Sequence, residues 1–250
     1  MDTTPASEGS RYWLAGGSVP VPHLTIAGMR FAAEHSRLID LHLFFSEAKL
    51  EKLSGTSIAE TPAAIQLLAE MAEHDGLLAE VILCRTVDNY LCYVTELLAL
   101  IYKARPETLR TSEQERLDFI LQYESMDELR TAIAEKRVER LSYLGLRDLA
   151  NHLQATMAFD LFPNAKDQDR ASLLIEYRNL IVHTRGIVST TSARKAKELR
   201  SMVGTRINIH PKSVRETRQF LENAVIDTDV RAAEKFALPV AKIPTPPEDL

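Results

Sequence analysis

The chain has few of the residues that build β-sheets and none of the segments that mark secreted or membrane proteins. Only 6% of its 250 residues are aromatic and only nine are glycine, whereas β-sandwiches and barrels normally need more of both. No stretch approaches roughly 18 uninterrupted apolar residues, the length of a membrane-spanning helix. The start MDTTPASEGS lacks the basic and apolar regions of a secretory signal. These absences predict a helical, cytoplasmic protein with no membrane partner.

Disulfide and metal-binding patterns are also missing. The two cysteines, Cys84 and Cys92, lie eight positions apart in an apolar segment, and we interpret them as reduced core thiols. The sequence has no CxxC or HExxH motif, and its seven histidines do not cluster with cysteines. We therefore expect no metal site and no cofactor.

The eleven prolines lie in the two terminal segments and at boundaries between predicted helices. Because proline disrupts helix interiors, the proline-free tracts predict long helices. We predict an extended leader at residues 1–23, a single helical domain at 24–238 and a flexible proline-rich tail at 239–250. Short connections favour antiparallel neighbours, so the predicted fold is all-α, an up-and-down bundle with an extra N-terminal helix.

Individual helices are predicted from apolar periodicity and from residues that favour helix ends. Thr61-Pro62 is typical of a helix start, and the tract after it forms either one long helix or two, with Asp75-Gly76 as its break signal. Capping boxes at Ser112–Glu115 and Ser125–Glu128 open two more helices. The other predicted elements are helices at 24–53, 146–159, 168–185 and 211–236, a short basic helix at 191–202 and an extended piece at 206–210.

Charge is unevenly distributed along the chain. The net charge is −5, but residues 177–218 contain ten Lys and Arg residues and only two acidic ones. Such asymmetry indicates a surface for an anionic ligand on an otherwise acidic body, although the same pattern is also found on solvated faces. Within this stretch we expect Arg185, Arg194 and Lys195 to bind substrate.

Residues 171–186 combine an apolar surround with a row of polar side chains. Most positions are Leu, Ile or Val, so the helix is expected to be buried. Ser172, Glu176, Asn179 and His183 nevertheless recur at intervals of three and four residues, on one side of the helix. Buried polar groups without partners cost about 1–3 kcal/mol each. The row therefore indicates a site, with Glu176 in a supporting role, or a face that packs against an equally polar partner.

Three residues of this helix are of the types needed to cleave RNA without a metal. The helix dipole favours a charged imidazole at His183 and nearby arginines oppose it, so the side chain can serve as general acid or base. Arg178 offers a planar, charged fork for a phosphate, and Asn179 can orient the imidazole or a substrate oxygen. In such cleavage a base deprotonates the 2′-hydroxyl, an arginine stabilises the phosphorane and an acid protonates the leaving 5′ oxygen. A second copy of the helix would supply the second histidine.

The spacing of Arg178 and His183 is not informative by itself, because the chain contains four Arg-x4-His pairs. Side chains five residues apart on a helix diverge by roughly 140°. This pair is distinguished by the asparagine after the arginine, the apolar surround and the glycine that ends the helix. Arg147 and His152 form the strongest competing pair, which we interpret as part of an amphipathic surface helix.

The segment Arg178-Asn-Leu-Ile-Val-His183-Thr-Arg-Gly186 resembles the Arg-polar-x3-His signature of HEPN domains, in their prokaryotic ribonuclease and defence-associated branch. The likeness spans about residues 80–236. It includes three further segments that are similar to one group of standalone HEPN-like proteins: Val87-Asp-Asn-Tyr-Leu91, Glu96-Leu-Leu98 and Pro106-Glu-Thr-Leu109.

The resemblance implies a bundle of four to five helices that forms a homodimer about a two-fold axis, with the signature helices of both protomers lining one ribonuclease cleft. It implies that Arg178 and His183 are catalytic and that Asn179 supports them. It also implies a toxin, abortive-infection or anti-phage role, with RNA as substrate and an antitoxin or another defence protein as partner. Some HEPN toxins carry a tyrosine two residues after the histidine, which a nucleotidyltransferase antitoxin modifies. Arg185 stands there in this chain, so that mode of neutralisation is not expected.

Three hypotheses remain open from the sequence. The first is a homodimeric endoribonuclease that leaves 2′,3′-cyclic phosphate ends, which the intact Arg178, Asn179 and His183 favour. The second is a HEPN-fold module that binds RNA or a partner protein without cutting. The third is an unrelated helical protein in which Arg178 and His183 are satisfied core polar groups.

Overall fold

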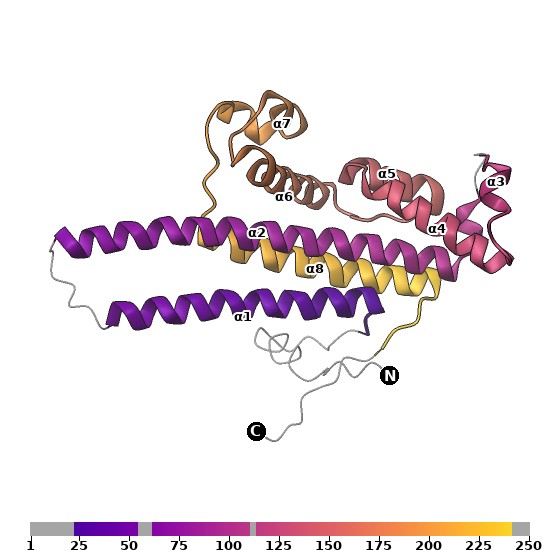
Figure 1. Ribbon diagram of the computed structural model, residues 1–250, viewed down its shortest axis with the longest axis horizontal. Helices are drawn as coiled ribbons and strands as arrows, with labels where there is room; N and C mark the ends of the chain where they lie inside the picture. Colours follow the sequence, from indigo (N-terminus) through magenta and orange to yellow (C-terminus); the bar gives the residue numbers. More distant parts are fainter. Residues whose placement is uncertain (1–22, 55–61, 111–113, 242–250) are drawn as a thin grey trace, which may run out of the picture. The chain divides into compact units, whose positions relative to one another are not determined.

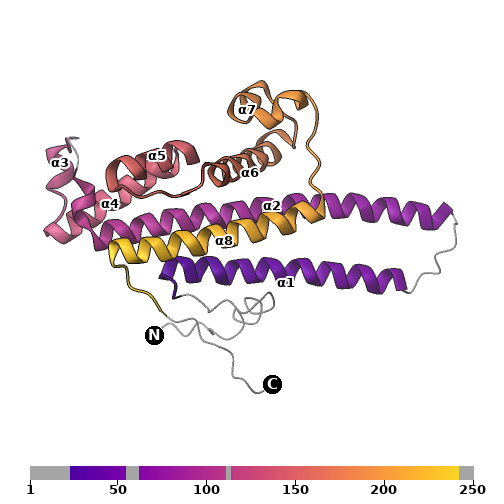
Figure 2. The same ribbon diagram turned by 180° about the vertical axis from the view of Figure 1, so that it is seen from behind.

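The computed structural model describes residues 23–54, 62–110 and 114–241, and within them the chain is mostly helical (Figures 1 and 2). Its extended segments in this part contribute two isolated antiparallel bridges and no strand. The all-α prediction is therefore confirmed. Most of the predicted leader and tail lies outside the described residues. No helix in the described ranges combines the length and apolar character needed to cross a membrane.

The helices largely follow the proline punctuation of the sequence. The tract after residue 61 forms one continuous helix, and Gly76 lies in its interior without breaking it. The α-helices are α1 (Ile26–Ser54), α2 (Pro62–Ala104), α3 (Leu117–Ile120), α4 (Met126–Ser142), α5 (Leu146–Met157), α6 (Ala165–Thr184), α7 (Thr190–Lys195) and α8 (Pro211–Phe236), and the short 3₁₀ helices are η1 (Pro106–Leu109) and η2 (Lys197–Met202).

The two predicted capping boxes have different outcomes. The Ser125 side chain accepts a hydrogen bond from the backbone N–H of Glu128 at 3.2 Å, which confirms the start of α4. The box predicted at Ser112 is wrong in its described part, because residues 114–116 are not helical and α3 begins later without a side-chain cap. Glu115, which would complete that box, instead forms an ion pair with Lys136 at 2.6 Å.

The described chain divides into two compact units, each made of segments that are distant in sequence. Helices α1, α2, α6 and α8 contribute residues to both units. The first unit comprises residues 23–31, 91–110, 114–169 and 224–241, and the second comprises residues 32–54, 62–90 and 170–223. The prediction of a single domain over residues 24–238 stays a prediction.

Aromatic and apolar side chains of α1, α2 and α8 form the core of the first unit. The ring of Phe31 meets Tyr93 edge to face with centroids 6.0 Å apart, and Phe159 meets Phe236 in the same way at 5.5 Å. All four of these side chains are buried. Cys92, next to Tyr93 on α2, is exposed, whereas Cys84 is half-buried. The interpretation of both cysteines as core thiols is therefore wrong for Cys92, which lies on the outer side of its helix.

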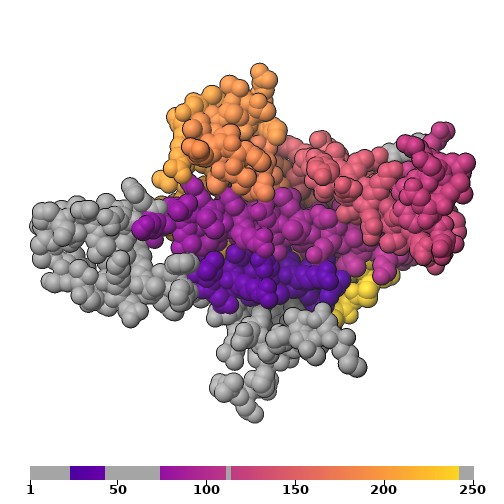
Figure 3. All heavy atoms as spheres, in the orientation of Figure 1, coloured from indigo at the N-terminus to yellow at the C-terminus, as the bar shows by residue number. Residues whose placement is uncertain are grey.

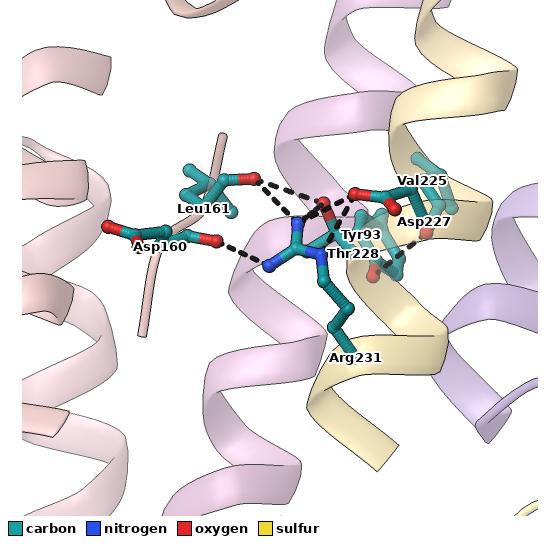
Figure 4. A network of polar contacts seen from close by, with 7 residues as sticks. All are labelled: Tyr93, Asp160, Leu161, Val225, Asp227, Thr228 and Arg231. Atoms are coloured by element: carbon teal, nitrogen blue, oxygen red, sulfur yellow. Dashed lines mark hydrogen bonds and ion pairs between the residues drawn. The ribbon is translucent and has the colours of Figure 1, made fainter. Parts of the chain in front are cut away.

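Arg231 of α8 holds the segment that follows α5 in the first unit (Figure 4). Its guanidinium donates to the backbone carbonyls of Asp160 at 2.6 Å and Leu161 at 3.3 Å, and to the carboxylate of Asp227 at 2.9 Å. The Thr228 hydroxyl donates to the same Leu161 carbonyl at 3.1 Å. These bonds satisfy backbone groups in a connection that has no helix or sheet of its own.

A buried carboxylate fixes the start of α1 in the first unit. Asp229 is 0% exposed and accepts hydrogen bonds from the Thr25 backbone N–H at 2.7 Å and hydroxyl at 2.6 Å. Burial raises the pKa of Asp229, and the bonds from Thr25 oppose that shift. A Cβ at Gly28 would lie 2.8 Å from the Asp229 carboxylate oxygen. The position therefore requires glycine for reasons of space.

Gly28→Ala should lower the free energy of unfolding by about 1–3 kcal/mol, because the added methyl group overpacks against Asp229. Gly76→Ala is the matched control, since a Cβ at this helical position meets nothing within 4 Å. It should raise the free energy of unfolding by about 1 kcal/mol, the difference in helix propensity. Urea unfolding of the two variants measures both values, and equal effects in the same direction would contradict the close contact.

His35 of α1 is the most deeply buried histidine of the second unit, with 2% of its surface exposed. Burial, with a smaller contribution from the positive charge of Arg218, lowers its pKa to about 4. Its Nε2 lies 3.8 Å from a carboxylate oxygen of Glu222, whose pKa is raised by burial. The imidazole is thus neutral at pH 7, and the contact with Glu222 is not an ion pair.

This lowered pKa predicts a loss of stability in acid. The unfolded chain binds a proton at His35 from about pH 6.5 downward, whereas the folded chain binds it only near pH 4. Between these values the His35 contribution should fall by about 3 kcal/mol as the pH decreases. The buried carboxylates Glu222 and Asp229 oppose this slope, so the measurement is the difference between wild type and His35→Leu in unfolding free energy from pH 7 to 4. Replacing the exposed His74 with leucine is the control, and an equal slope in His35→Leu and wild type would contradict the assignment.

Candidate functional site

The polar row of the sequence lies on α6, in the second unit. Ala171, Leu174 and Leu180 are the buried residues of this helix. Most of the remaining residues between 172 and 181 are half-buried, and Val182 and His183 are exposed. The prediction of a buried helix is therefore wrong, because one face of α6 packs within its unit while the opposite face is left uncovered by the described chain.

Arg178 is held in place by an acidic residue of α2. Its Nε donates to the Asp88 carboxylate at 2.8 Å and its Nη1 donates to the Asn179 side-chain oxygen at 3.2 Å. The Arg178 and Asp88 side chains are 26% and 31% exposed. Within the described residues these two acceptors leave the Nη2 group of Arg178 available to a ligand. The guanidinium is thus oriented before any substrate arrives.

The end of α6 exposes His183 and turns the chain back. Arg185 and Gly186 both have left-handed backbone conformations, with φ of 54° and 80°, and the Gly186 N–H donates to the Leu180 carbonyl at 2.8 Å. The predicted left-handed glycine is confirmed, and Arg185 shares this conformation. A Cβ at Gly186 would lie 3.2 Å from the Arg206 side chain. The tight turn leaves Arg185 exposed immediately after the exposed His183.

The chain then forms a lobe at residues 186–210, the orange group of atoms in Figure 3. Backbone hydrogen bonds of 2.9 Å join Val188 to Thr205 and Ile207 to Gly186. The basic helix predicted here is divided into α7 and η2, because the backbone at Ala196 is extended with φ of −129° and ψ of 116°. The predicted substrate residues Arg194 and Lys195 are exposed at the end of α7.

Several charges of this lobe are paired within the second unit. Lys195 contacts Glu176 at 3.2 Å, where the Glu176 side chain is only 12% exposed. Arg206 contacts Glu80 of α2 at 2.8 Å. These bonds attach α7 to α6 and the returning segment to α2, so part of the basic stretch has a structural role. Arg185 and Arg194 have no ion pair with a described residue.

The structure brings together two pairs of the predicted site residues and leaves the others apart. Arg178 contacts Asn179, and Glu176 contacts Lys195. Among the described contacts, no hydrogen bond or ion pair joins His183 to Arg178. Their five-residue separation on a helix places them on different sides, as expected from a turn of 3.6 residues. A single protomer therefore does not gather the arginine and the histidine at one point.

Asp88 and Glu80 are site residues that sequence reasoning missed. Asp88 stands in the apolar stripe of α2, directly after buried Val87 and one turn from buried Tyr90 and Leu91's neighbours. A carboxylate in such a run is costly without a partner, and this was the available signal. Its partner lies 90 positions away, however, so no local pattern identifies it.

Arg147 and His152 form no comparable site. They lie on α5, where Leu146, Leu149 and Leu153 are buried, and Arg147 is exposed and paired with Asp169 at 2.7 Å. The interpretation of this pair as part of an amphipathic helix is confirmed.

No group of three or more His, Cys, Asp or Glu side chains suited to a metal ion occurs in the part of the chain that the structure describes. No family model, curated protein or solved structure matches the chain.

Proposed function

We propose that the protein is a metal-independent endoribonuclease of the HEPN type, with an active site formed where the α6 helices of two protomers meet. The observation that carries the proposal is the pre-oriented guanidinium of Arg178, held by Asp88 at 2.8 Å, on a helix that ends in the exposed His183. An ordered phosphate-binding fork and an accessible imidazole are the two groups that this reaction needs.

Each residue of the site has a distinct proposed task. Arg178 binds the scissile phosphate through its Nη2 edge and stabilises the charge that develops on the phosphorane. His183 accepts the 2′-hydroxyl proton, and the partner protomer's copy of this residue donates a proton to the leaving 5′ oxygen. Asn179 and Asp88 position the guanidinium, and exposed Arg185 and Arg194, beside Lys195, extend the positive surface along the RNA.

The uncovered face of α6 supports pairing with a second copy of this chain. Val182 is 52% exposed beside His183, and Ile187 is 49% exposed just after the helix. Large apolar side chains next to a polar site are typical of interfaces. A two-fold axis near them would bring two arginine and histidine pairs to one cleft, which the separation within one protomer makes necessary.

We further propose a role as a toxin or in anti-phage defence, in the cytoplasm where RNA is available, with an antitoxin or another defence protein as regulator. A ribonuclease without recognition of a specific site harms its own cell and so needs control. Arg185, at the position where some related toxins carry a modified tyrosine, favours control by binding over control by modification.

The second candidate is a HEPN-fold module that binds RNA or a partner protein without cutting. The ion pairs of Arg178 with Asp88 and of Lys195 with Glu176 favour it, because they satisfy these charges within the chain. Binding in this case relies on the remaining exposed arginines.

Analysis of RNA ends separates the two candidates. Purified protein is incubated with total RNA in the presence of EDTA, and the products are mapped and treated with an enzyme that removes cyclic phosphate. The proposal requires fragments with 2′,3′-cyclic phosphate and 5′-hydroxyl ends. RNA that is bound and remains intact would favour the second candidate.

A further inference from the structure

An open pocket in the first unit lies outside the proposed ribonuclease site. It has a volume of about 340 Å³ and is lined by residues from η1, from α4 and from the segment between them. This volume is within the usual range of small-molecule sites, roughly 300–1,000 Å³. None of the residues singled out on α6 belongs to its lining.

The lining of this pocket is strongly basic in an acidic protein. It contains five cationic side chains and the single carboxylate of Glu115, which is already paired with Lys136 at 2.6 Å. The cationic residues are Arg110, Arg130, Lys136, Arg137 and Arg140. Four of them belong to α4 and recur at intervals of three and four residues, with two adjacent, so they share one face of the helix. A solvated basic face usually intersperses both signs of charge, whereas this one concentrates one sign around a hollow.

The field of these arginines reaches the protein interior. Tyr102 of α2 is buried, with 2% of its surface exposed. Burial raises the pKa of its phenol, and the guanidinium groups of Arg137 and Arg140 oppose that shift. Both arginines thus lie close enough to Tyr102 for their charges to act on the same site.

The wall of the pocket also has an apolar part. Pro106 and Leu109 of η1 and Ile133 of α4 line it together with the cations. Ile133 lies midway between Arg130 and the pair Lys136 and Arg137 on the same helix face. A ligand that fits this lining carries several negative charges next to an apolar or flat group. Arginine forks recognise phosphate oxygens in pairs, which favours phosphate over a lone carboxylate.

We propose that this pocket binds a small ligand with two or more phosphate groups attached to an apolar or heterocyclic group, the class of nucleoside di- and triphosphates. Five cations against one carboxylate leave four positive charges for such a ligand to balance. The site is built from the first unit alone and does not require the ribonuclease proposal to be correct.

The test is a calorimetric titration of the full-length protein with ATP in EDTA, with adenosine and with inorganic triphosphate. ATP should bind more tightly than adenosine, because the cations recognise phosphate, and more tightly than triphosphate, because the apolar wall contacts the base. Arg137→Gln/Arg140→Gln should weaken ATP binding about tenfold or more. Arg130→Gln/Lys136→Gln is a second pocket pair, for use if the first alters thermal unfolding.

Arg116→Gln/Arg147→Gln is the matched control, since it removes two positive charges from exposed residues of the same unit that do not line the pocket. It should bind ATP as wild type does. The proposal is overturned if ATP does not bind at millimolar concentration, if adenosine binds equally well, or if the pocket and control pairs behave alike. Binding of an RNA oligonucleotide without binding of ATP would also overturn it.

Discussion

His183→Ala should lower the rate of RNA cleavage by about 10²–10⁴-fold, the usual contribution of a general acid or base. Because His183 is exposed at the end of α6, its removal should leave the thermal unfolding temperature nearly unchanged. The measurement is cleavage of a labelled RNA in EDTA, with circular dichroism on the same samples. A large loss of activity without a loss of stability would identify a chemical role.

His152→Ala is the control for this experiment. It belongs to the Arg-x4-His pair that lies on the amphipathic α5, and it should retain wild-type cleavage. If His183→Ala and wild type cleave RNA equally, or if both are inactive under conditions in which the protein is folded, the ribonuclease proposal fails. A fall in activity that merely follows a fall in stability would support a structural role for the polar row.

Arg178→Ala should lower cleavage by about 10²–10³-fold, as expected when a donor to developing charge is removed. Arg178→Lys should recover only a small part of this loss, because an ammonium group cannot form the fork that Asp88 and Asn179 orient. The pair with Asp88 is partly exposed, so its loss should cost less than about 1 kcal/mol of stability. Kinetic constants and unfolding free energies of both variants test these values.

Asp88 provides the matched comparison for a positioning role. Asp88→Asn keeps an oxygen acceptor for the Arg178 Nε and removes the negative charge, so KM for RNA should decrease while kcat changes little. Asp88→Ala removes the acceptor, so kcat should decrease about tenfold as the guanidinium loses its orientation. Equal effects of the two substitutions would contradict positioning through the hydrogen bond.

The helices could be predicted from the sequence wherever the signal was local. Pro211 marks the first residue of α8, and Ser125 caps α4, because both effects act within one turn of the helix. The continuity of α2 through Gly76 was left open, since a glycine in a helix costs only about 1 kcal/mol and long apolar neighbours outweigh it. The false start at Ser112 shows the opposite case, in which Glu115 contacts the distant Lys136 instead of its own helix end.

The candidate site was predictable in its residues and not in its contacts. Arg178 and His183 were identified from their context, and their separation within one protomer follows from helix geometry. Asp88 and Glu80 were missed, because each pairs with an arginine at least 90 positions away. The exposure of α6 was mistaken for burial, since an apolar composition does not distinguish a core helix from one that awaits a second copy.

The basic pocket of the first unit illustrates the same limit. Arg130, Lys136, Arg137 and Arg140 are evenly spaced along α4 and read as an ordinary solvated face in the sequence. Their relation to Pro106 and Leu109 of η1 depends on how the chain returns after α2, for which the sequence has no local signal.

The central claim is that two copies of α6 contribute to one cleft, and mixed dimers test it most directly. Protomers with Arg178→Ala and with His183→Ala are expressed together with different affinity tags, and the mixed dimer is isolated through both tags. We predict that each parental dimer is inactive in EDTA and that the mixed dimer cleaves RNA well above both, because it retains one intact arginine and one intact histidine across the axis. A mixed dimer as inactive as its parents, or a chain that remains monomeric during sedimentation, would contradict the claim.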